Sequence, residues 1–430
     1  MLVWIFLIVL LLLIFGGMAI AFSMAVTSLV VVVFDRGLGN IPYGIIAQRM
    51  VYGVNSFPLL AIPFFLLAGR LMNTAGITDR IFRFCNVLIG HVQGGLGHVN
   101  ILASMIFAGM SGSAVSDAVG LGQIEIKAMK DQGYDADFSA AVTAASATIG
   151  PIIPPSIPMV LYGVLGNVSV GALFIGGIVP GVLMGLFMMI TVSIIAKRRN
   201  YPVQKRAGFT DILRATVNGL FPLLCPLILV GGIWSGVFTP TEAAAVAVIY
   251  SLFLGLILYR ELNFRSLIKV LREALDDTSV ILFIISAASL YGWLLARYQI
   301  PAGIAEKILA ITQDPLIILL LVNGFLLVVG CFMESLAAIN ILTPILLPLV
   351  VKVGIDPIHF GVVMVLNLMI GLLTPPVGMV LYSVQRVANI PFERLQRALL
   401  IFFFPLLAVL VLITLYPPLV TWLPSTLWRK

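Results

Sequence analysis

The sequence predicts an all-α polytopic membrane protein, an inverted repeat of about ten to twelve transmembrane helices with two re-entrant hairpins and two broken helices. Of the 430 residues, 61% are hydrophobic and 10% are charged, whereas soluble domains carry roughly 25% charged residues. A soluble fold has too little interior for this much apolar surface, and the alternating pattern of an outer-membrane barrel is missing. The net charge of +7 is assigned to cytoplasmic loops rather than to nucleic-acid binding.

Two proline-rich stretches interrupt apolar segments at corresponding places in the two halves. The first is Gly150–Ser156, within an apolar segment at 138–165, and the second is Gly371–Gly378, within 357–387. Proline cannot donate a backbone hydrogen bond and disfavours helix in the residue before it, so neither segment can form one intact helix. In lipid the freed carbonyls need protein or ion partners. Paired broken helices of this kind are typical of the binding site of a transporter.

Small polar residues in the middle of two further apolar stretches predict re-entrant hairpins. Residues 96–126 carry Ser111–Ser113 at their centre, and residues 316–350 carry Gly330–Ser335. A chain that turns back inside the membrane needs a tip whose backbone polar groups are buried in protein. We therefore expect each stretch to form two helices that are joined at these tips.

The remaining elements follow from the alternation of apolar and polar segments along the chain. Residues 1–34 predict either two short tilted helices that meet near Gly16-Gly17 or one very long helix, because one span needs about 20 residues. Glu242, which follows Thr239-Pro240-Thr241, is interpreted as a first-turn helix acid. Surface helices are expected at 36–54, 79–93 and 260–275, spans at 56–72, 173–196, 217–236, 241–258, 279–296 and 399–416, and a short polar arm at 389–397.

The two halves of the sequence match at a separation of about 220 residues, which indicates an internal repeat. Gly109 pairs with Gly330, and Met159–Tyr162 pairs with Met379–Tyr382. Loops on one side of the predicted membrane hold 18 of the 25 Lys and Arg residues, so these loops are assigned to the cytoplasm. The first hairpin then opens to the cytoplasm and the second to the outside, which makes the repeats inverted.

The repeat divides the chain into predicted scaffold and transport segments. Each transport half contains one hairpin and one broken helix, and scaffold helices and arms flank it. The scaffold of the first repeat is expected at 1–95 and its transport half at 96–170, the scaffold of the second repeat at 171–298 and its transport half at 314–388, and a C-terminal arm with the last helix at 389–430.

The tips and the breaks carry the oxygen atoms that a sodium ion takes as ligands. Unwound backbone carbonyls and the hydroxyl groups of Ser and Thr hold such an ion without burying a fixed charge. The expected sodium ligands are Ser111, Ser113, Gly150, Pro151 and Pro154 in the first half, and Ser335, Gly371, Thr374 and Pro375 in the second.

The same tips are expected to bind an anion, because half-helices that begin there present free amides and the positive end of a helix dipole. Asp117 and Glu334 are acids in apolar surroundings, and they either line the site or lie in water just outside the membrane. The expected substrate-binding residues are Ser116, Asp117, Ser156, Glu334 and Asn340.

The sequence contains no motif for a transition-metal site, for nucleotide hydrolysis or for nucleophilic catalysis. The three His and three Cys residues are dispersed and form no metal set, and the sequence contains neither a P-loop nor a nucleophile elbow. We therefore expect neither an enzyme nor a bound cofactor, with sodium as the only metal ion.

Three motifs together resemble one transporter family. They are Phe107–Ala118 (FAGMSGSAVSDA), Pro154-Pro155-Ser156 and Phe238–Tyr250 (FTPTEAAAVAVIY). From end to end, the chain resembles the large membrane subunit (DctM-like, or M subunit) of tripartite ATP-independent periplasmic (TRAP) transporters.

This resemblance implies an elevator mechanism in the bacterial inner membrane. A transport domain with both hairpins and both broken helices slides against a scaffold and carries sodium and an organic acid, a carboxylate, inward. Two protein partners are also implied, a small four-helix membrane subunit and a soluble periplasmic substrate-binding protein. The chain starts directly at the large subunit, so the small subunit is expected to be a separate polypeptide, and no nucleic-acid partner is expected.

Two other interpretations make different demands on the residues. A stand-alone sodium/dicarboxylate symporter of related architecture needs no binding protein, and that group typically carries Ser-Asn-Thr at both tips. Here the tips are Ser-Gly-Ser and Met-Glu-Ser. An intramembrane enzyme or an assembly scaffold is the remaining interpretation, and an enzyme needs convergent His, Asp or metal ligands in mid-membrane, which the sequence lacks.

Overall fold

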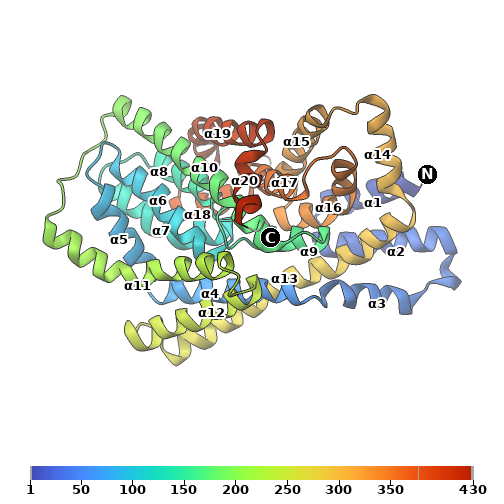
Figure 1. The fold of residues 1–430 in the computed structure, drawn as a ribbon, viewed down its shortest axis with the longest axis horizontal. Coiled ribbons are helices and arrows are strands. Elements are labelled where there is room, and N and C mark those ends of the chain that lie inside the picture. The colour runs from blue at the N-terminus through green and yellow to red at the C-terminus, as the bar shows by residue number, and fades with distance from the viewer. Residues whose placement is uncertain (1, 376, 428–430) are drawn as a thin grey trace.

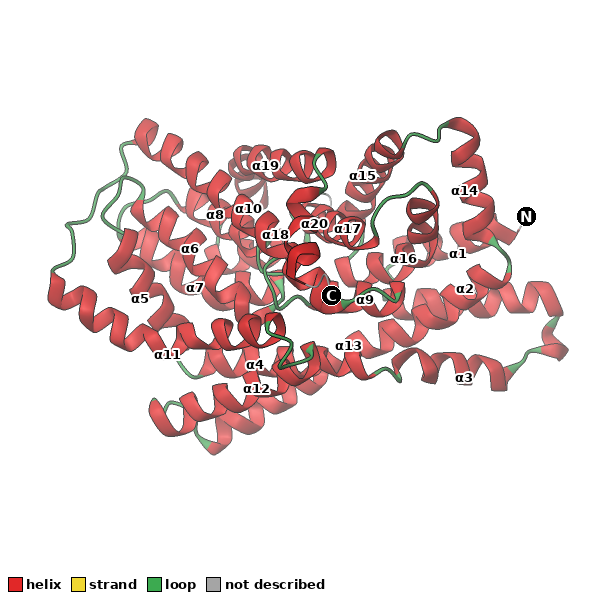
Figure 2. Ribbon diagram, viewed as in Figure 1, coloured by secondary structure: helices red, strands yellow, loops and turns green. Residues whose placement is uncertain are grey.

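The structure is a computed structural model that describes residues 2–375 and 377–427. Within these ranges the chain forms helices and loops without a strand, and Figure 1 and Figure 2 show how the twenty α-helices are arranged. Eight helices in the described ranges are long and apolar enough to cross a membrane. The predicted all-helical membrane fold is confirmed, and Pro376 of the second break lies outside the described residues.

The N-terminal segment forms two helices with a break between them. α1 (Leu2–Phe15) ends just before Gly17, whose φ of +84° is a conformation that residues with a side chain rarely adopt. α2 (Ile20–Arg36) then packs against α1 and against α13 (Phe264–Arg297). Of the two alternatives for residues 1–34, the one with two short helices is confirmed.

α13 is one continuous helix of 34 residues. The sequence predicted a surface helix at 260–275 and a separate span at 279–296, and this separation is wrong. A capping box between Asn263 and Ser266 starts the helix, and no proline interrupts it afterwards. The amphipathic arm and the span are therefore rigidly joined, and the acidic residues of the arm keep a fixed position relative to the span.

The arm helix α3 (Tyr43–Val54) lies alongside α13 (Figure 1). The Ser286 hydroxyl donates a hydrogen bond of 2.9 Å to the Met50 carbonyl. Gly53 lies so close to Ser289 that a side chain has no room there. Small residues thus bring the two helices together, as is common between helices in lipid.

The helices α4 (Ala61–Thr74) and α12 (Pro240–Leu252) pack against each other, and α4 also contacts α13, so these three helices form a layer along the lower side of Figure 1. α12 begins with a capping box in which the Glu242 carboxylate accepts from the N–H and the hydroxyl of Thr239, both at 2.8 Å. The interpretation of Glu242 as a first-turn helix acid is confirmed. The elements on this side are α4 (Ala61–Thr74), α5 (Ile77–Ile89), α11 (Phe209–Trp234) and α12 (Pro240–Leu252), with 3₁₀ turns at Leu38–Asn40 and Phe57–Leu60 and wider helical turns at Phe253–Leu258.

Both predicted helical hairpins are present in the structure. Their tips lie at Gly112-Ser113 and at Met333-Glu334, within the two small or polar sequence motifs that predicted them. The first hairpin consists of α6 (Gly95–Ser111) and α7 (Ala114–Asp131), and the second consists of α15 (Pro315–Phe332) and α16 (Ser335–Lys352).

Both predicted helix breaks are present as well. Each hairpin packs against the broken helix that follows it in the chain. The two halves also contact each other, because α7 packs against α18 (Met379–Ala388) and α16 packs against α9 (Ile157–Gly166). The first break separates α8 (Ala136–Ala147) from α9 (Ile157–Gly166), and the second separates α17 (Pro357–Gly371) from α18 (Met379–Ala388).

Four helices complete the fold. α10 (Val170–Arg199) contacts α6, α9, α17 and α19 (Phe392–Leu415). The predicted polar arm at 389–397 is only partly separate from the last span, because α19 already begins at Phe392. The sequence did not predict α14 (Ile300–Ile311) or α20 (Pro418–Leu427), which are too short for a full span. The division into scaffold and transport segments stays a prediction, since one arrangement of helices does not show which of them move together.

Outside the membrane helices, the loop before α8 is tied to the chain that follows α10. The Asp135 carboxylate accepts hydrogen bonds from the Tyr201 hydroxyl (2.7 Å) and from the Arg199 guanidinium (2.6 Å). The Tyr201 hydrogen bond, followed by the Arg199 contact, lowers the pKa of Asp135. The carboxylate therefore stays charged at neutral pH and holds the hairpin-to-break connection against α10.

Candidate functional site

The structure brings the two hairpin tips together. A small cavity of about 60 Å³ is lined by Ser113 and Pro151 from the first half and by Glu334, Ser335 and Leu372 from the second. Residues that are far apart in the sequence therefore share one site, which is built from tip and break residues of both repeats.

In the first half, the buried carboxylate of Asp117 lies between the tip and the break. The Ser111 hydroxyl donates to its Oδ1 atom. Asp117 is only 2% exposed, and its Oδ2 atom has no hydrogen-bond partner among the described residues. That atom points at Gly150, which has no space for a side chain on this side. The structure thus groups Asp117, predicted for substrate, with two predicted sodium ligands.

The first tip is docked on the first break through its backbone. The Ile157 N–H donates to the Gly112 carbonyl at 3.4 Å. Gly112 has a φ of +63°, and a side chain there would come within 2.8 Å of the Pro155 carbonyl oxygen. The tip therefore requires glycine for its backbone conformation as well as for its contact.

Ser156 has a local role inside the first break. Its hydroxyl donates to the Pro151 carbonyl and accepts from the Met159 N–H at 3.2 Å, so it caps the start of α9. Ser156 is fully buried. It does not line either of the cavities that adjoin the tips, whereas the Pro151 side chain does line the small one. Pro154 approaches Gly109 of α6 through its carbonyl.

In the second half, Glu334 caps the helix that begins at its own tip. Its Oε2 atom accepts from the N–H groups of Leu336 (2.8 Å) and Ala337 (3.1 Å), and its Oε1 atom accepts from the Ser335 hydroxyl (2.8 Å). The carboxylate therefore occupies the free amides that the sequence assigned to an anionic ligand. Glu334 nevertheless lines both cavities at the tips.

The second hairpin meets the second break through a contact between two glycines. A Cβ at Gly371 would lie 2.5 Å from the Gly330 Cα, so the two backbones touch directly. The Val377 N–H donates to the Cys331 carbonyl at 3.2 Å. The Thr374 hydroxyl donates to the Ile370 carbonyl at 2.9 Å, which leaves the lone pairs of its oxygen free to accept or to coordinate.

Asn340 lies on α16, more than one turn after the second tip. Its side-chain N–H donates to the Leu336 carbonyl at 2.9 Å, and its Oδ1 atom is buried without a partner in the described part of the chain. It does not line either tip cavity. Pro375 follows Thr374 in the break and adjoins the residue that the structure does not describe.

Sequence reasoning missed a pair of buried amide clusters that fasten each hairpin to its broken helix. Asn100 on α6 donates to the Thr143 hydroxyl (2.7 Å) and accepts from the Ser146 hydroxyl (2.7 Å), both on α8. In the second half, Asn367 on α17 donates to Asn323 on α15 at 2.8 Å. The signal was available, because polar residues in mid-span that match across a repeat are rarely accidental.

We expect the change Asn100→Ala to destabilise the protein by about 1–3 kcal/mol, because it removes two buried hydrogen bonds and leaves two hydroxyls short of partners. The measurement is the thermal unfolding midpoint of the purified protein in detergent. Ser104→Ala is the matched control, since the Ser104 hydroxyl makes only one side-chain contact in this cluster, 3.0 Å to Ser146. Equal stability losses in both variants would contradict the central role of Asn100.

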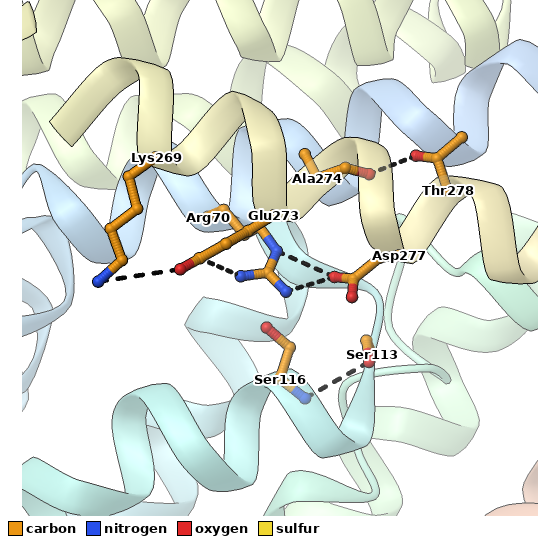
Figure 3. Close-up of polar contacts among 8 residues, drawn as sticks. All are labelled: Arg70, Ser113, Ser116, Lys269, Glu273, Ala274, Asp277 and Thr278. Atoms are coloured by element: carbon orange, nitrogen blue, oxygen red, sulfur yellow. Dashed lines mark hydrogen bonds and ion pairs between the residues drawn. The ribbon is translucent and has the colours of Figure 1, made fainter. Parts of the chain in front are cut away.

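A second, larger cavity of about 560 Å³ separates the first hairpin from α4 and α13. Ser113 and Ser116 line it from the hairpin side, and Arg70, Glu273 and Asp277 line it from the other (Figure 3). The sequence analysis placed no site on these three charged residues. Their positions at the polar ends of apolar spans were a weak signal, because such charges usually lie at a solvated membrane surface.

These residues form no group of three His, Cys, Asp or Glu side chains that could hold a metal ion, and the same is true throughout the described residues. The site instead offers backbone carbonyls, hydroxyls and one buried carboxylate. Such a donor set fits a monovalent cation held at a helix break better than a transition metal.

Comparison with known proteins agrees with this architecture. A family model described as "Tripartite ATP-independent periplasmic transporter, DctM component" matches residues 7–419. The sialic acid TRAP transporter large permease protein SiaM of Vibrio cholerae is 47% identical over 96% of this chain and 96% of its own length. The C4-dicarboxylate TRAP transporter large permease protein DctM of Pseudomonas aeruginosa is 42% identical over 86% of this chain and 87% of its own.

Among solved structures, the YdaH transporter of Alcanivorax borkumensis covers 89% of this chain and 89% of its own, with a TM-score of 0.64 and 14% sequence identity. This likeness shows a shared fold. The two relatives are permease proteins of transporters, so this chain is a multi-pass permease of the inner membrane and not an enzyme. The chain belongs to the DctM component family of tripartite ATP-independent periplasmic transporters.

Proposed function

We propose that this chain imports an organic acid, a carboxylate, across the inner membrane together with sodium ions. The observation that carries the proposal is the buried Asp117 carboxylate, whose Oδ2 atom lacks a partner among the described residues and faces the backbone of the first break. An unpaired buried charge is strongly unfavourable, and a bound cation removes that penalty. Sodium in this position would be held by Asp117, Ser111 and carbonyl oxygens near Gly150.

A second sodium ion is proposed at the equivalent place in the second half. The Thr374 hydroxyl and the carbonyls that follow Gly371 lie in the second break, next to the tip that contains Ser335. The position that corresponds to Asp117 is Ala338, so this half has no carboxylate at that place, and the Glu334 carboxylate at the tip is already bound by the amides of its own helix. We expect the second ion to bind more weakly than the first for this reason.

The substrate is proposed to bind between the tips as an anion. The relatives SiaM and DctM are named for sialic acid and for C4-dicarboxylates, both of which carry a carboxylate. Two bound sodium ions would offset the negative charges of Asp117 and Glu334 at the tips, so an anionic ligand would no longer be repelled. Ser113 and Ser116 line the adjoining cavity and can donate hydrogen bonds to carboxylate oxygens. Sialic acid is the first probe to use, given the 47% identity to SiaM.

We infer an elevator mechanism from the way the site is assembled. Both hairpins and both broken helices contact one another, so they can move as one body that carries the site. The large cavity lies between this body and the helices α4 and α13. Because basic loops lie at the ends of α4 and α7, we propose that this cavity opens to the cytoplasm, as in an inward-open state of the transporter.

The proposed partners are a separate small four-helix membrane subunit and a periplasmic binding protein that delivers the substrate. The family is described as tripartite and periplasmic, which supports two further components. Many large apolar side chains on α1, α2 and α11 are exposed, and lipid or a membrane partner can cover them. Contact with such a partner would depend on close packing of complementary side chains, because the hydrophobic effect does not favour association of helices within lipid.

Reconstitution into proteoliposomes tests this function. Uptake of labelled sialic acid, with succinate as a second probe, is measured for the chain alone, with the small subunit, and with the binding protein added. We expect uptake only in the complete assembly and only with an inward sodium gradient. Full-rate sodium-driven uptake by the lone chain would instead support the stand-alone symporter, and uptake that ignores sodium would reject the coupling.

A further inference from the structure

One ion cluster in the structure has no part in the proposed sodium sites. Arg70 on α4 donates through Nε to Asp277 (2.9 Å) and through Nη1 to Glu273 (2.5 Å), and its Nη2 also reaches Asp277. The two acids lie one turn apart on α13, and Figure 3 shows Arg70 bridging from one helix to the other. The sequence does not predict that these residues meet, because α4 and α13 are about 200 residues apart in the chain.

The cluster faces the large cavity rather than the interior of the scaffold. The side chains of Arg70, Glu273 and Asp277 are 30%, 39% and 41% exposed, so a ligand in the cavity can reach them. Across the cavity lie Ser113 and Ser116 at the tip of the first hairpin, and Figure 3 shows Ser116 below Arg70 and Ser113 below Asp277. A substrate that leaves the tips toward the cytoplasm must pass this wall.

The guanidinium retains binding capacity in this arrangement. Its three bonds to the acids use only part of its N–H groups, and the remaining ones have no hydrogen-bond partner among the described residues. Lys269 also contacts Glu273, at 3.9 Å, but this lysine is 77% exposed and adds little in water. Asp277 takes the bonds from Nε and Nη2, which form the edge of the guanidinium that a substrate carboxylate can bind with two oxygens, so Asp277 is the carboxylate that a ligand would replace.

We propose that Arg70 is a binding station for the carboxylate of the substrate on its release path, and that Asp277 occupies the guanidinium whenever the station is empty. This inference rests on the proposed import of an organic acid. Replacing one carboxylate by another on the same guanidinium breaks and forms bonds of the same kind, so the exchange is close to neutral in energy. The substrate is guided through the cavity without being trapped there.

Comparison with two simpler arrangements, an arginine without acids and the acids without an arginine, explains why the cluster contains both. An arginine without a partner would hold a carboxylate tightly and slow its release, because charge-assisted bonds to a guanidinium are strong. Without the arginine, Glu273 and Asp277 would face the cavity as two uncompensated negative charges and would repel an anion. Arg70 with its displaceable acid avoids both outcomes.

Two substitutions in this cluster are expected to shift substrate affinity in opposite directions. Asp277→Asn replaces a charged acceptor by a neutral one, so the substrate competes more easily for Arg70, and we expect about tenfold tighter binding with slower turnover. Arg70→Gln removes the station and leaves both acids, and we expect at least about tenfold weaker binding. A cluster that merely braces α4 against α13 would lose activity in both variants, with no gain of affinity in either.

The experiment uses the reconstituted complete transporter with sialic acid and succinate as probes. Affinity is measured by equilibrium binding at saturating sodium, and turnover is measured by exchange of labelled substrate across the proteoliposome membrane. Lys269→Gln on the same face of α13 is the control and should leave both values unchanged. Opposite shifts for Asp277→Asn and Arg70→Gln support the station, and unchanged affinity or losses in both variants overturn it.

Two further measurements, the thermal stability of each variant and uptake by the wild type, separate failure of the binding station from failure of folding and from failure of the proposed function. Thermal stability is measured for each variant, and if Arg70→Gln fails to fold, Asp277→Asn decides alone, because unchanged or weaker binding in that variant overturns the proposal. If the wild-type transporter shows no sodium-driven uptake of either acid, the proposed function itself fails and the station falls with it. Wild-type uptake together with losses in both variants rejects the station only.

Discussion

Replacing Asp117 by asparagine is expected to abolish sodium-driven uptake by the assembled transporter while leaving the protein folded. Asparagine keeps the size of the side chain and its bond from the Ser111 hydroxyl, but it removes the negative charge opposite Gly150. Loss of a charged ligand from a buried cation site costs about 3 kcal/mol, or about 100-fold in sodium affinity. The initial uptake rate is therefore measured against external sodium concentration.

The space around Asp117 allows a sharper version of this test. Asp117→Glu retains the charge, but its additional methylene group would push the carboxylate beyond its present position and against the backbone of Gly150, which the Asp117 Oδ2 atom already approaches closely. We expect this variant to lose uptake as well, which separates position from charge. Asp131→Asn, at the exposed end of the same helix, is the matched control and should transport normally.

The contrary outcome of the asparagine test is also informative. If Asp117→Asn retains the sodium dependence of the wild type, the carboxyl group acts as a neutral hydrogen-bonding group in the hairpin. Sodium would then be bound by neutral oxygens alone, as proposed for the second half of the repeat. Gel filtration and thermal unfolding of each variant establish that any loss of uptake comes from the site and not from the fold.

Replacing Gly330 by alanine is expected to reduce uptake about tenfold or more, through the docking of the second hairpin on the second break. A Cβ at Gly330 would lie 2.9 Å from the Gly371 Cα, which is closer than real Cβ contacts are found. The contacting atom belongs to the backbone and cannot rotate away, so the hairpin must shift. Overpacking of this kind typically costs about 1–3 kcal/mol.

The same helix supplies the control for this substitution. Gly324 lies on the exposed side of α15, and a Cβ there has no atom within 4 Å. Gly324→Ala should therefore leave uptake unchanged or slightly increase stability, since alanine is the better helix former. Uptake and the sodium concentration for half-maximal rate are measured for both variants. Normal uptake by Gly330→Ala would show that the tip tolerates displacement from the break, contrary to our expectation.

The two halves of the repeat differ in how their tips use acidic residues. In the first half Asp117 points back from the second helix toward the break, and its Oδ2 atom has no partner among the described residues. In the second half Glu334 lies at the tip itself and is bound by the amides of its own helix and by Ser335. A fold with symmetric helices thus carries an asymmetric distribution of charge, which supports different roles for the two tips.

Most of the helical elements could be predicted from the sequence, because their signals are local. Apolar runs define the spans, Pro151 and its neighbours force the first break, and the small residues of Ser111–Ser113 allow the first hairpin tip. The near-constant separation of matching motifs revealed the repeat, and the distribution of Lys and Arg predicted its inversion. These features depend on residues that are close in the chain, or on counts of residues that can be made without a structure.

Local patterns also failed at identifiable places. The arm at 260–275 was separated from the span that follows, because a change in polarity was taken for a helix end, whereas the helix continues through Asp276, Asp277 and Thr278 without a proline. α14 and α20 were missed because short apolar helices look like ordinary connections in a membrane protein. In both cases composition along the chain did not specify whether the backbone continues or turns.

The sequence by itself determined that this chain is a helical transporter component with paired hairpins and paired breaks, because proline chemistry and lipid permit few other structures. Only the tertiary structure decided which of the candidate residues face each other. Asp117 lies with Ser111 and Gly150, Ser156 is used inside its own break, and Arg70 meets Asp277 across the scaffold. Contacts between distant segments arise from helix packing, and that packing is specified by the whole set of side-chain shapes rather than by a local pattern.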